Sequence, residues 1–138
     1  MIQIVAGSWE HLKAAAQQIR EQVFILEQQI APEDEWDAED AVATHFVLYH
    51  DQEAVATARL LSNDRIGRVA VLAQYRGQGL GAKLMQNVLD FAQQQGRTQV
   101  HLSSQVQAMA FYQALGFVAA GEPYLDCDIA HIHMQLAF

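Results

Sequence analysis

The stretch from Arg68 to Gly96 constrains the fold of this chain more than any other. Arg68–Val71 is short, apolar and β-branched, which is typical of a buried strand. Glycines then alternate with other residues, and after them apolar residues recur at a spacing of four, as on one face of an amphipathic helix. These apolar residues are Leu80, Leu84, Val88 and Ala92. Gly96 stands where a left-handed helix C-cap is common. The stretch therefore predicts a strand, a glycine-rich turn and a helix.

A helix that begins at a glycine-rich turn presents unpaired backbone N–H groups without side chains in the way, and such a place binds phosphate. Three phosphate-binding motifs are compared here. A P-loop requires Lys and Ser/Thr directly after its last glycine. In this chain Ala82 separates Gly81 from Lys83, and Leu84 follows. The P-loop interpretation is therefore excluded.

The two remaining motifs both match the turn. Gly77, Gly79 and Ala82 satisfy the dinucleotide fingerprint G-x-G-x-x-A, which also expects an acidic residue at the end of the next strand. The next expected strand, 99–103, is followed by Ser104 and Gln105 and has no such carboxylate. The third motif is R-x-x-G-x-G, met by Arg76, Gly79 and Gly81, and it resembles the coenzyme A pyrophosphate loop of the GNAT N-acetyltransferase superfamily.

Further segments carry the same resemblance. Residues 108–117, Ala-Met-Ala-Phe-Tyr-Gln-Ala-Leu-Gly-Phe, resemble the family's next motif, a short helix with Phe-Tyr followed by Leu-Gly-Phe at the start of a strand. Residues 20–28 and 130–134 resemble the ends of the small ElaA/YjcF-like branch, which usually has proline where Ala130 stands. The two main motif blocks together cover roughly the second half of the core fold.

The resemblance implies an α+β fold in one domain over residues 1–138. The expected sheet is mixed and mostly antiparallel, with helices on both faces and a splayed central pair of strands at 68–71 and 99–103. It implies transfer of an acetyl group from acetyl-CoA to a primary amine on a small molecule or a peptide. Two alternatives stay open: a non-catalytic acyl-CoA sensor or regulator, and a nucleotide-binding module that uses the G-x-G-x-x-A match. Family members often form homodimers, which is implied here as well.

The resemblance also assigns roles to residues. Backbone groups of the 68–71 strand would orient the acyl-pantetheine arm, the glycine turn would hold the pyrophosphate, and Arg76 would contact phosphate or brace the loop. Tyr112 matches the family's general acid, and a phenol with an ordinary pKa near 10 is protonated at neutral pH. The residues expected at the cofactor are Val69, Ala70, Val71, Arg76, Gly77, Gln78, Gly79, Leu80, Gly81, Ala82, Ala108, Phe111 and Tyr112.

The base that deprotonates the acceptor ammonium is not evident from a motif, because residues 65–68 contain no carboxylate. Glu27 is the first candidate and His131 the second, since histidine can titrate in the right range. Other candidates are His45, Glu122 and a water molecule, and Ser103 is expected to contact the acceptor or the cofactor. His131 and His133 share one strand face, but spacing offers no third ligand, so no metal is expected.

Composition and charge narrow the classes of partner and the cellular location that the chain is expected to have. The formal net charge of −8 argues against nucleic acid as a partner and mildly favours a cationic acceptor. No apolar run approaches the ~18 residues of a membrane span. Cys127 is the only cysteine, so no internal disulfide can form, which agrees with a cytoplasmic protein. Its acidic neighbours disfavour a reactive thiolate.

The segment from Ala31 to Val42 is the most acidic part of the chain. It contains six carboxylates, Pro32 and Trp36, and it lacks helical or strand periodicity. We expect a loop with at most one helical turn. One interpretation is a solvated acidic surface. The other is a rim of the site that attracts a cationic acceptor and offers Trp36 as an apolar wall.

Overall fold

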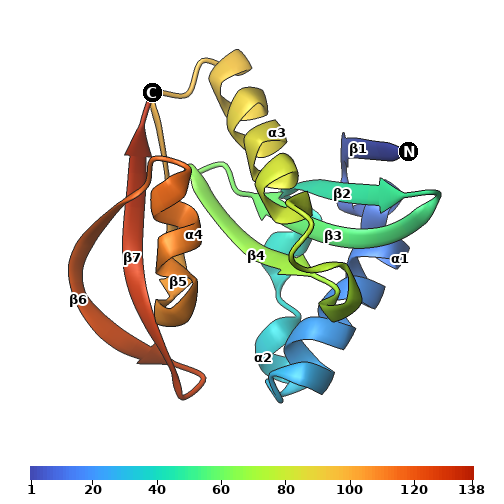
Figure 1. Ribbon diagram of the computed structural model, residues 1–138, viewed down its shortest axis with the longest axis horizontal. Helices are drawn as coiled ribbons and strands as arrows, with labels where there is room; N and C mark the ends of the chain where they lie inside the picture. The colour runs from blue at the N-terminus through green and yellow to red at the C-terminus, as the bar shows by residue number, and fades with distance from the viewer.

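The computed structural model describes all 138 residues, and its seven strands form one sheet in the order β1-β2-β3-β4-β5-β7-β6 (Figure 1). Neighbouring strands are antiparallel except β4 and β5, which are parallel. The expected mixed, mostly antiparallel α+β architecture is confirmed. The strands are β1 (Ile2–Gly7), β2 (Thr44–His50), β3 (Glu53–Leu60), β4 (Arg65–Val71), β5 (Gln99–Gln105), β6 (Val118–Asp126) and β7 (Ile129–Ala137).

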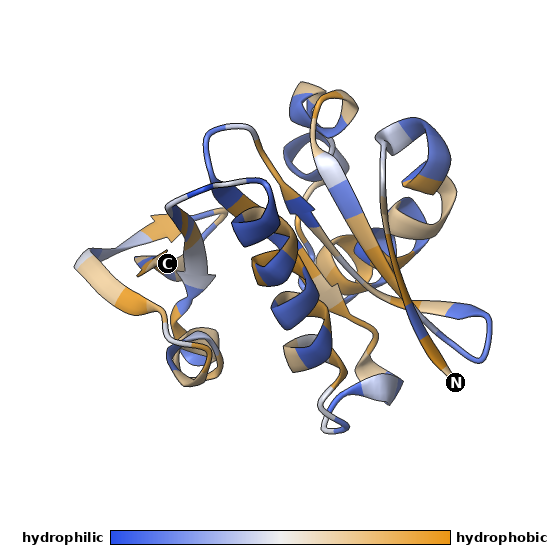
Figure 2. Cartoon of the chain, turned by 90° about the horizontal axis from the view of Figure 1, so that it is seen from above, coloured by the Kyte–Doolittle hydropathy of each residue, from blue (hydrophilic) through white to orange (hydrophobic).

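Helices cover both faces of the sheet, as expected. Alternate residues of β2 point to opposite sides: Phe46 and Leu48 pack in a core with α3, whereas Val47 packs with α1. The hydrophobic stripe of α3 runs along one side of that helix (Figure 2). The α-helices are α1 (Trp9–Arg20), α2 (Pro32–Glu35), α3 (Leu80–Gln94) and α4 (Met109–Ala114). No helix combines the length and the hydropathy needed to cross a bilayer.

The parallel strands β4 and β5 separate soon after they meet. They pair only at Arg65 with His101 and at Ile66 with Leu102, and the remainder of β4 has no partner on that edge. The α3 helix connects the two strands, as the strand–helix–strand prediction required. The predicted splayed strand pair is therefore confirmed, and it opens the sheet next to the glycine turn.

One local prediction differs from the structure, and a second is confirmed. Gly121 and Pro123 predict a loop as far as His131. In the structure β6 instead runs to Asp126 and turns directly into β7. A register irregularity between Ala120 and Tyr124 accommodates the proline, which cannot donate to the ladder. The apolar pattern that begins at Leu12 continues to Leu26 and predicts a helix that ends or bends near Glu27. The helix does so by changing from α to π geometry over Glu21–Glu27.

Candidate active site

A cleft of about 790 Å³ lies where β4 and β5 separate. One end is formed by the glycine turn and α4, and the other by the segment 31–42, the outer end of β5 and the β6–β7 turn. Every residue expected at the cofactor lines this cleft except Gln78. Segments that are far apart in the sequence are thus brought together at one opening in the sheet.

The glycine turn is built to expose backbone N–H groups. Gly77 and Gly79 have φ values of +80° and +77°, a left-handed conformation that glycine adopts without strain. The amide groups from Gly77 to Ala82 donate no backbone hydrogen bond, and the first bond of α3 runs from Lys83 N–H to the Gly79 carbonyl. Six consecutive donors at a helix N-terminus, where the helix dipole is positive, suit a pyrophosphate.

Gly81 allows the turn to pack closely against α4. A Cβ atom at this position would lie 3.4 Å from the ring of Phe111 and 3.5 Å from Val71. The glycine at this position therefore lets the glycine turn, the end of β4 and α4 meet without an intervening side chain. A Cβ atom here would already make van der Waals contact with both neighbours, which leaves little room for a longer side chain.

Arg76 braces the loop in this structure. Its guanidinium donates to both carboxylate oxygens of Glu27, at 2.6 and 2.8 Å, and its Nε donates to the Val71 carbonyl at 2.9 Å. The hydrogen bond from Arg76 lowers the pKa of Glu27, and the same bond raises the pKa of Arg76. Glu27, the first candidate base, does not line the cleft. Its carboxylate instead ties the end of the π-helical segment to the loop.

Tyr112 is buried in α4 and lines the cleft. Its ring meets Phe111 and Phe117 edge-on, with centroids 5.0 and 5.9 Å away. Burial raises the pKa of the phenol, because the phenolate would lose its hydration. The hydroxyl is therefore protonated at neutral pH and can donate a proton or a hydrogen bond.

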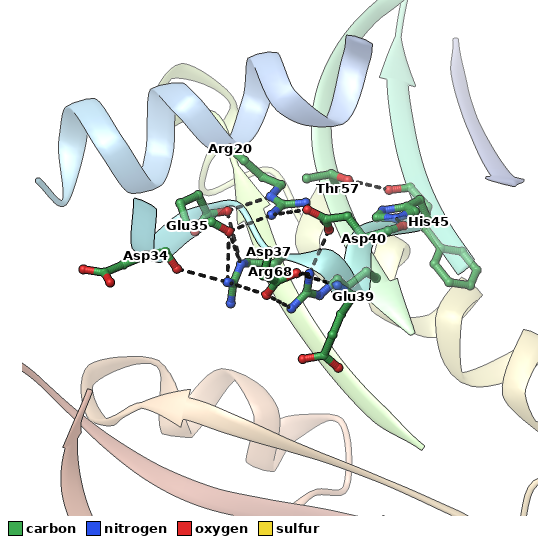
Figure 3. A network of polar contacts seen from close by, with 11 residues as sticks. Arg20, Asp34, Glu35, Asp37, Glu39, Asp40, His45, Thr57 and Arg68 are labelled. Carbon is green, nitrogen blue, oxygen red and sulfur yellow. Dashed lines mark hydrogen bonds and ion pairs between the residues drawn. The ribbon is translucent and has the colours of Figure 1, made fainter. Parts of the chain in front are cut away.

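The opposite end of the cleft is held by an ionic cluster, which we define as Arg20, Glu35, Asp37, Asp40, Arg59 and Arg68. Arg20 is only 1% exposed, and it donates to Glu35 at 2.7 Å and to Asp40 at 2.8 Å (Figure 3). Arg59 donates to Asp37 at 2.7 Å and to Asp40 at 2.8 Å. The cluster joins the segment 31–42 to α1 and to the sheet.

Each interpretation of the acidic segment holds in part. The segment forms part of the rim of the cleft, because Asp34, Glu35, Asp37 and Glu39 line it. Glu35 and Asp40 are buried and Asp37 is paired, so these carboxylates are not a solvated surface; Glu33, Asp34 and Glu39 are exposed. Trp36 covers the guanidinium of Arg20, with 5.0 Å from the carbon Cζ to the ring, instead of forming an acceptor wall. It does not line the cleft.

Arg68 links the cluster to the cleft. It has a φ of +50°, unusual for a residue with a Cβ, at a bulge where β3 and β4 change register. Its side chain donates to the Glu35 carbonyl at 3.0 Å and to Asp37 at 3.2 Å. These contacts offset the local strain. The bulge precedes Val69, the first residue expected to orient the acyl arm.

The remaining candidates fall in different places. His131 and Ser103 line the cleft. His45 is buried away from it, contacts the Asp40 carbonyl at 2.8 Å, and has a pKa lowered by burial. Glu122 is exposed and does not line the cleft. Burial, followed by Asp126 and Asp34, raises the pKa of the Cys127 thiol, which is the direction expected from its acidic neighbours.

Sequence reasoning missed the arginines of the ionic cluster. Arg20, Arg59 and Arg68 come from α1, β3 and β4, and no spacing rule relates them to residues 35–40. The one available signal was an acidic segment in a chain with few basic residues. That composition alone cannot show which carboxylates are paired.

Comparison with known proteins agrees with this geometry. Residues 12–138 match the family model described as an acetyltransferase (GNAT) domain. YjcF of Bacillus subtilis, described as an uncharacterized N-acetyltransferase, is 32% identical over 136 residues, covering 96% of each chain. An acyl-CoA N-acyltransferase from Pseudomonas aeruginosa is 35% identical with a TM-score of 0.88, covering 99% of this chain and 100% of that one. ElaA from Escherichia coli is 30% identical with a TM-score of 0.88, covering 99% of both chains. The chain therefore belongs to the GNAT acetyltransferase family, in the branch of small proteins that includes YjcF and ElaA.

Proposed function

We propose that the protein transfers an acetyl group from acetyl-CoA to a primary amine. The observation that carries this proposal is the row of unpaired amides from Gly77 to Ala82, opening into the same cleft as the buried hydroxyl of Tyr112. An acyl-CoA needs both features, a phosphate cradle and a proton donor near its sulfur. The family membership supports the reaction class.

The residues present fit coenzyme A as a substrate. The amides of the glycine turn would bind the pyrophosphate, and the unpaired edge of β4 at Val69–Val71 would hydrogen-bond the pantetheine arm and the acyl carbonyl. Acetyl-CoA supplies an activated thioester. Tyr112 would give its hydroxyl proton to the departing thiolate, and the backbone N–H groups of β4 would stabilise negative charge on the carbonyl oxygen.

The first test of this proposal is a thermal-shift titration with acetyl-CoA, with free coenzyme A and NAD⁺ as comparisons. A ligand that binds only the folded state raises the melting temperature in a dose-dependent way. We expect a rise with both coenzyme A forms and none with NAD⁺. A rise with NAD⁺ alone would support the nucleotide-binding alternative, and no rise with any of the three would refute an acyl-CoA site.

Turnover separates the enzyme from a non-catalytic acyl-CoA sensor. Thiol release is measured with spermidine, glucosamine, free amino acids and a peptide with an unblocked N-terminus. We expect at least one amine to accelerate thiol release, and Tyr112→Phe to lower the turnover of that amine while the acetyl-CoA thermal shift persists. Equal turnover by Tyr112→Phe would remove this hydroxyl from the mechanism.

The cellular setting forms part of the proposal. A cytoplasmic location is consistent with a single, unreactive cysteine and with acetyl-CoA as donor. A homodimer stays a prediction from the family resemblance, and gel filtration with light scattering would test it.

A further inference from the structure

The proposed reaction requires a group that takes a proton from the acceptor ammonium, and the structure favours one candidate. His131 lies near the start of β7, where it pairs with Gln105 of β5 on one side and with Tyr124 of β6 on the other. It is partly buried and lines the cleft, as do its neighbours Ser103 and Gln105. The imidazole is therefore on the β5 side of the opening, across from β4.

Hydrogen bonding fixes which ring nitrogen of His131 carries hydrogen. Nδ1 lies 2.7 Å from the carbonyl oxygen of Ile129. A carbonyl can only accept a hydrogen bond, so Nδ1 must be the donor. In the neutral ring, Nε2 then has the free lone pair. Nε2 has no hydrogen-bond partner in the protein and is open to solvent, so it is free to accept a proton.

One neighbouring ring, that of Tyr124, packs against the imidazole. Tyr124 stacks against His131 with an interplanar angle of 25° and a centroid distance of 6.1 Å. The Tyr124 hydroxyl in turn contacts the hydroxyl of Ser103. His131 is thus oriented by a backbone carbonyl on one edge and by an aromatic face that is itself tethered to β5.

The competing carboxylates are less suitable. Glu27 is bound to Arg76 outside the cleft. Arg59 lowers the pKa of Asp37 to about 2, so that carboxylate is a weak base. Glu35 and Asp40 are buried within the ionic cluster. Other carboxylates also line the cleft, but they are exposed to solvent, whereas His131 is partly buried. These exposed groups are Asp34, Glu39 and Asp126.

We propose that His131 is the general base of the reaction and accepts the acceptor's proton at Nε2. This inference rests on the proposed function. Nε2 of His131 takes one proton from the acceptor ammonium. The lone pair that this frees on the acceptor nitrogen forms the C–N bond to the acyl carbon. When the C–S bond breaks, its electron pair goes to sulfur, which takes the Tyr112 proton. The acceptor nitrogen gives its second proton to the Tyr112 phenolate, which restores the phenol. His131 then releases its proton to solvent.

Charged and titratable groups face the imidazole from several elements. Asp126 ends β6 and Cys127 lies in the β6–β7 turn, while Asp34, Glu35, Asp37 and Arg68 line the cleft from α2, the segment after it and β4. The β5 neighbours Ser103 and Gln105 are uncharged. Protonated His131 cannot act as a base, so the proposal predicts an acidic limb in the pH profile of turnover.

The first experiment measures the tautomer directly and needs no acceptor. Two-bond ¹H–¹⁵N correlation spectra of the ¹⁵N-labelled protein, assigned by comparison with His131→Gln, report which nitrogen is protonated in the neutral ring. We expect the Nδ1–H form for His131. An Nε2–H form would overturn the proposal, because Nε2 could not then accept a proton.

The second experiment measures turnover with whichever amine of the panel above gives the fastest thiol release. His131→Gln should lower kcat roughly 100-fold or more at neutral pH and abolish the acidic limb, while the thermal shift with acetyl-CoA stays unchanged. His133→Gln is the matched control, because His133 is two residues away on the same strand and does not line the cleft. We expect it to retain wild-type turnover.

The outcomes separate the two proposals. If the wild-type protein acetylates a panel amine and His131→Gln remains within about three-fold of it, or keeps the acidic limb, His131 is not the base and the proposed function stands. If the wild-type protein binds acetyl-CoA but acetylates no amine of the panel, the proposed enzyme activity fails and the role of His131 fails with it.

Discussion

Replacing Arg20 by methionine tests whether the ionic cluster stabilises this fold. Arg20 is 1% exposed, and four of its hydrogen bonds go to Glu35 and Asp40. Removing one partner of a buried ion pair costs about 3–5 kcal/mol, because the other charge stays buried. In the variant Asp40 still forms an ion pair with Arg59, and Glu35 still forms one with Arg68. We therefore expect a loss at the lower end of this range, about 3 kcal/mol.

The expected change in melting temperature follows from chain length. An unfolding entropy of about 2.1 cal/mol/K per residue over 138 residues gives about 0.3 kcal/mol/K. A loss of about 3 kcal/mol therefore lowers the melting temperature by about 10 °C. Urea unfolding of the same variant should show a lower midpoint with an unchanged slope.

Two further variants sharpen the interpretation. Arg20→Lys keeps the charge but cannot reproduce the guanidinium fork that reaches both carboxylates, so we expect an intermediate loss. Arg65→Met is the control, because the exposed Arg65 side chain forms no ion pair, and it should change stability by less than about 0.5 kcal/mol. If Arg20→Met costs less than about 1 kcal/mol, or is stabilising, desolvation cancels the ion pairing and the reasoning is refuted.

Three other perturbations address acid stability, the phosphate turn and the loop brace. Arg59 lowers the pKa of Asp37 to about 2, below its unfolded value of 3.8, so its stabilisation is present above pH 4 and disappears as pH falls toward 2. Asp37→Asn should flatten that part of the curve of unfolding free energy against pH, and an unchanged slope would contradict this. Gly79→Ala places a Cβ on a residue with φ +77°, where no other atom lies within 4 Å of it, so the only cost is backbone strain. We expect a loss of about 1 kcal/mol, which lowers the melting temperature by about 3 °C. A stabilised variant would show that the turn adopts another conformation. Glu27→Gln removes the charged brace on Arg76, and because both side chains are 42% exposed we expect less than about 1 kcal/mol in stability but a several-fold weaker acetyl-CoA affinity by calorimetry. Wild-type affinity would mean that the loop keeps its shape without the brace.

Local patterns predicted the central unit well. The strand, glycine turn and α3 follow from apolar spacing and from the conformational freedom of glycine, both of which act over a few residues. Turn residues at 51–53 between two apolar runs predict the β2–β3 hairpin in the same way. The extension of β6 past Pro123 was missed, because pairing with β7 outweighed the local turn signal.

The sequence by itself determined the strand, the glycine turn and the α3 helix, which short-range periodicity encodes. Its motifs also carry the family resemblance that implied the fold class and the candidate site residues. Tertiary structure alone decided how the charged residues are used. It buried Glu35 and Asp40 against Arg20, bound Glu27 to Arg76, and placed His131 in the cleft with Nε2 accessible. The physical reason is that charge pairing and burial depend on distances between elements far apart in the chain, which no local pattern contains.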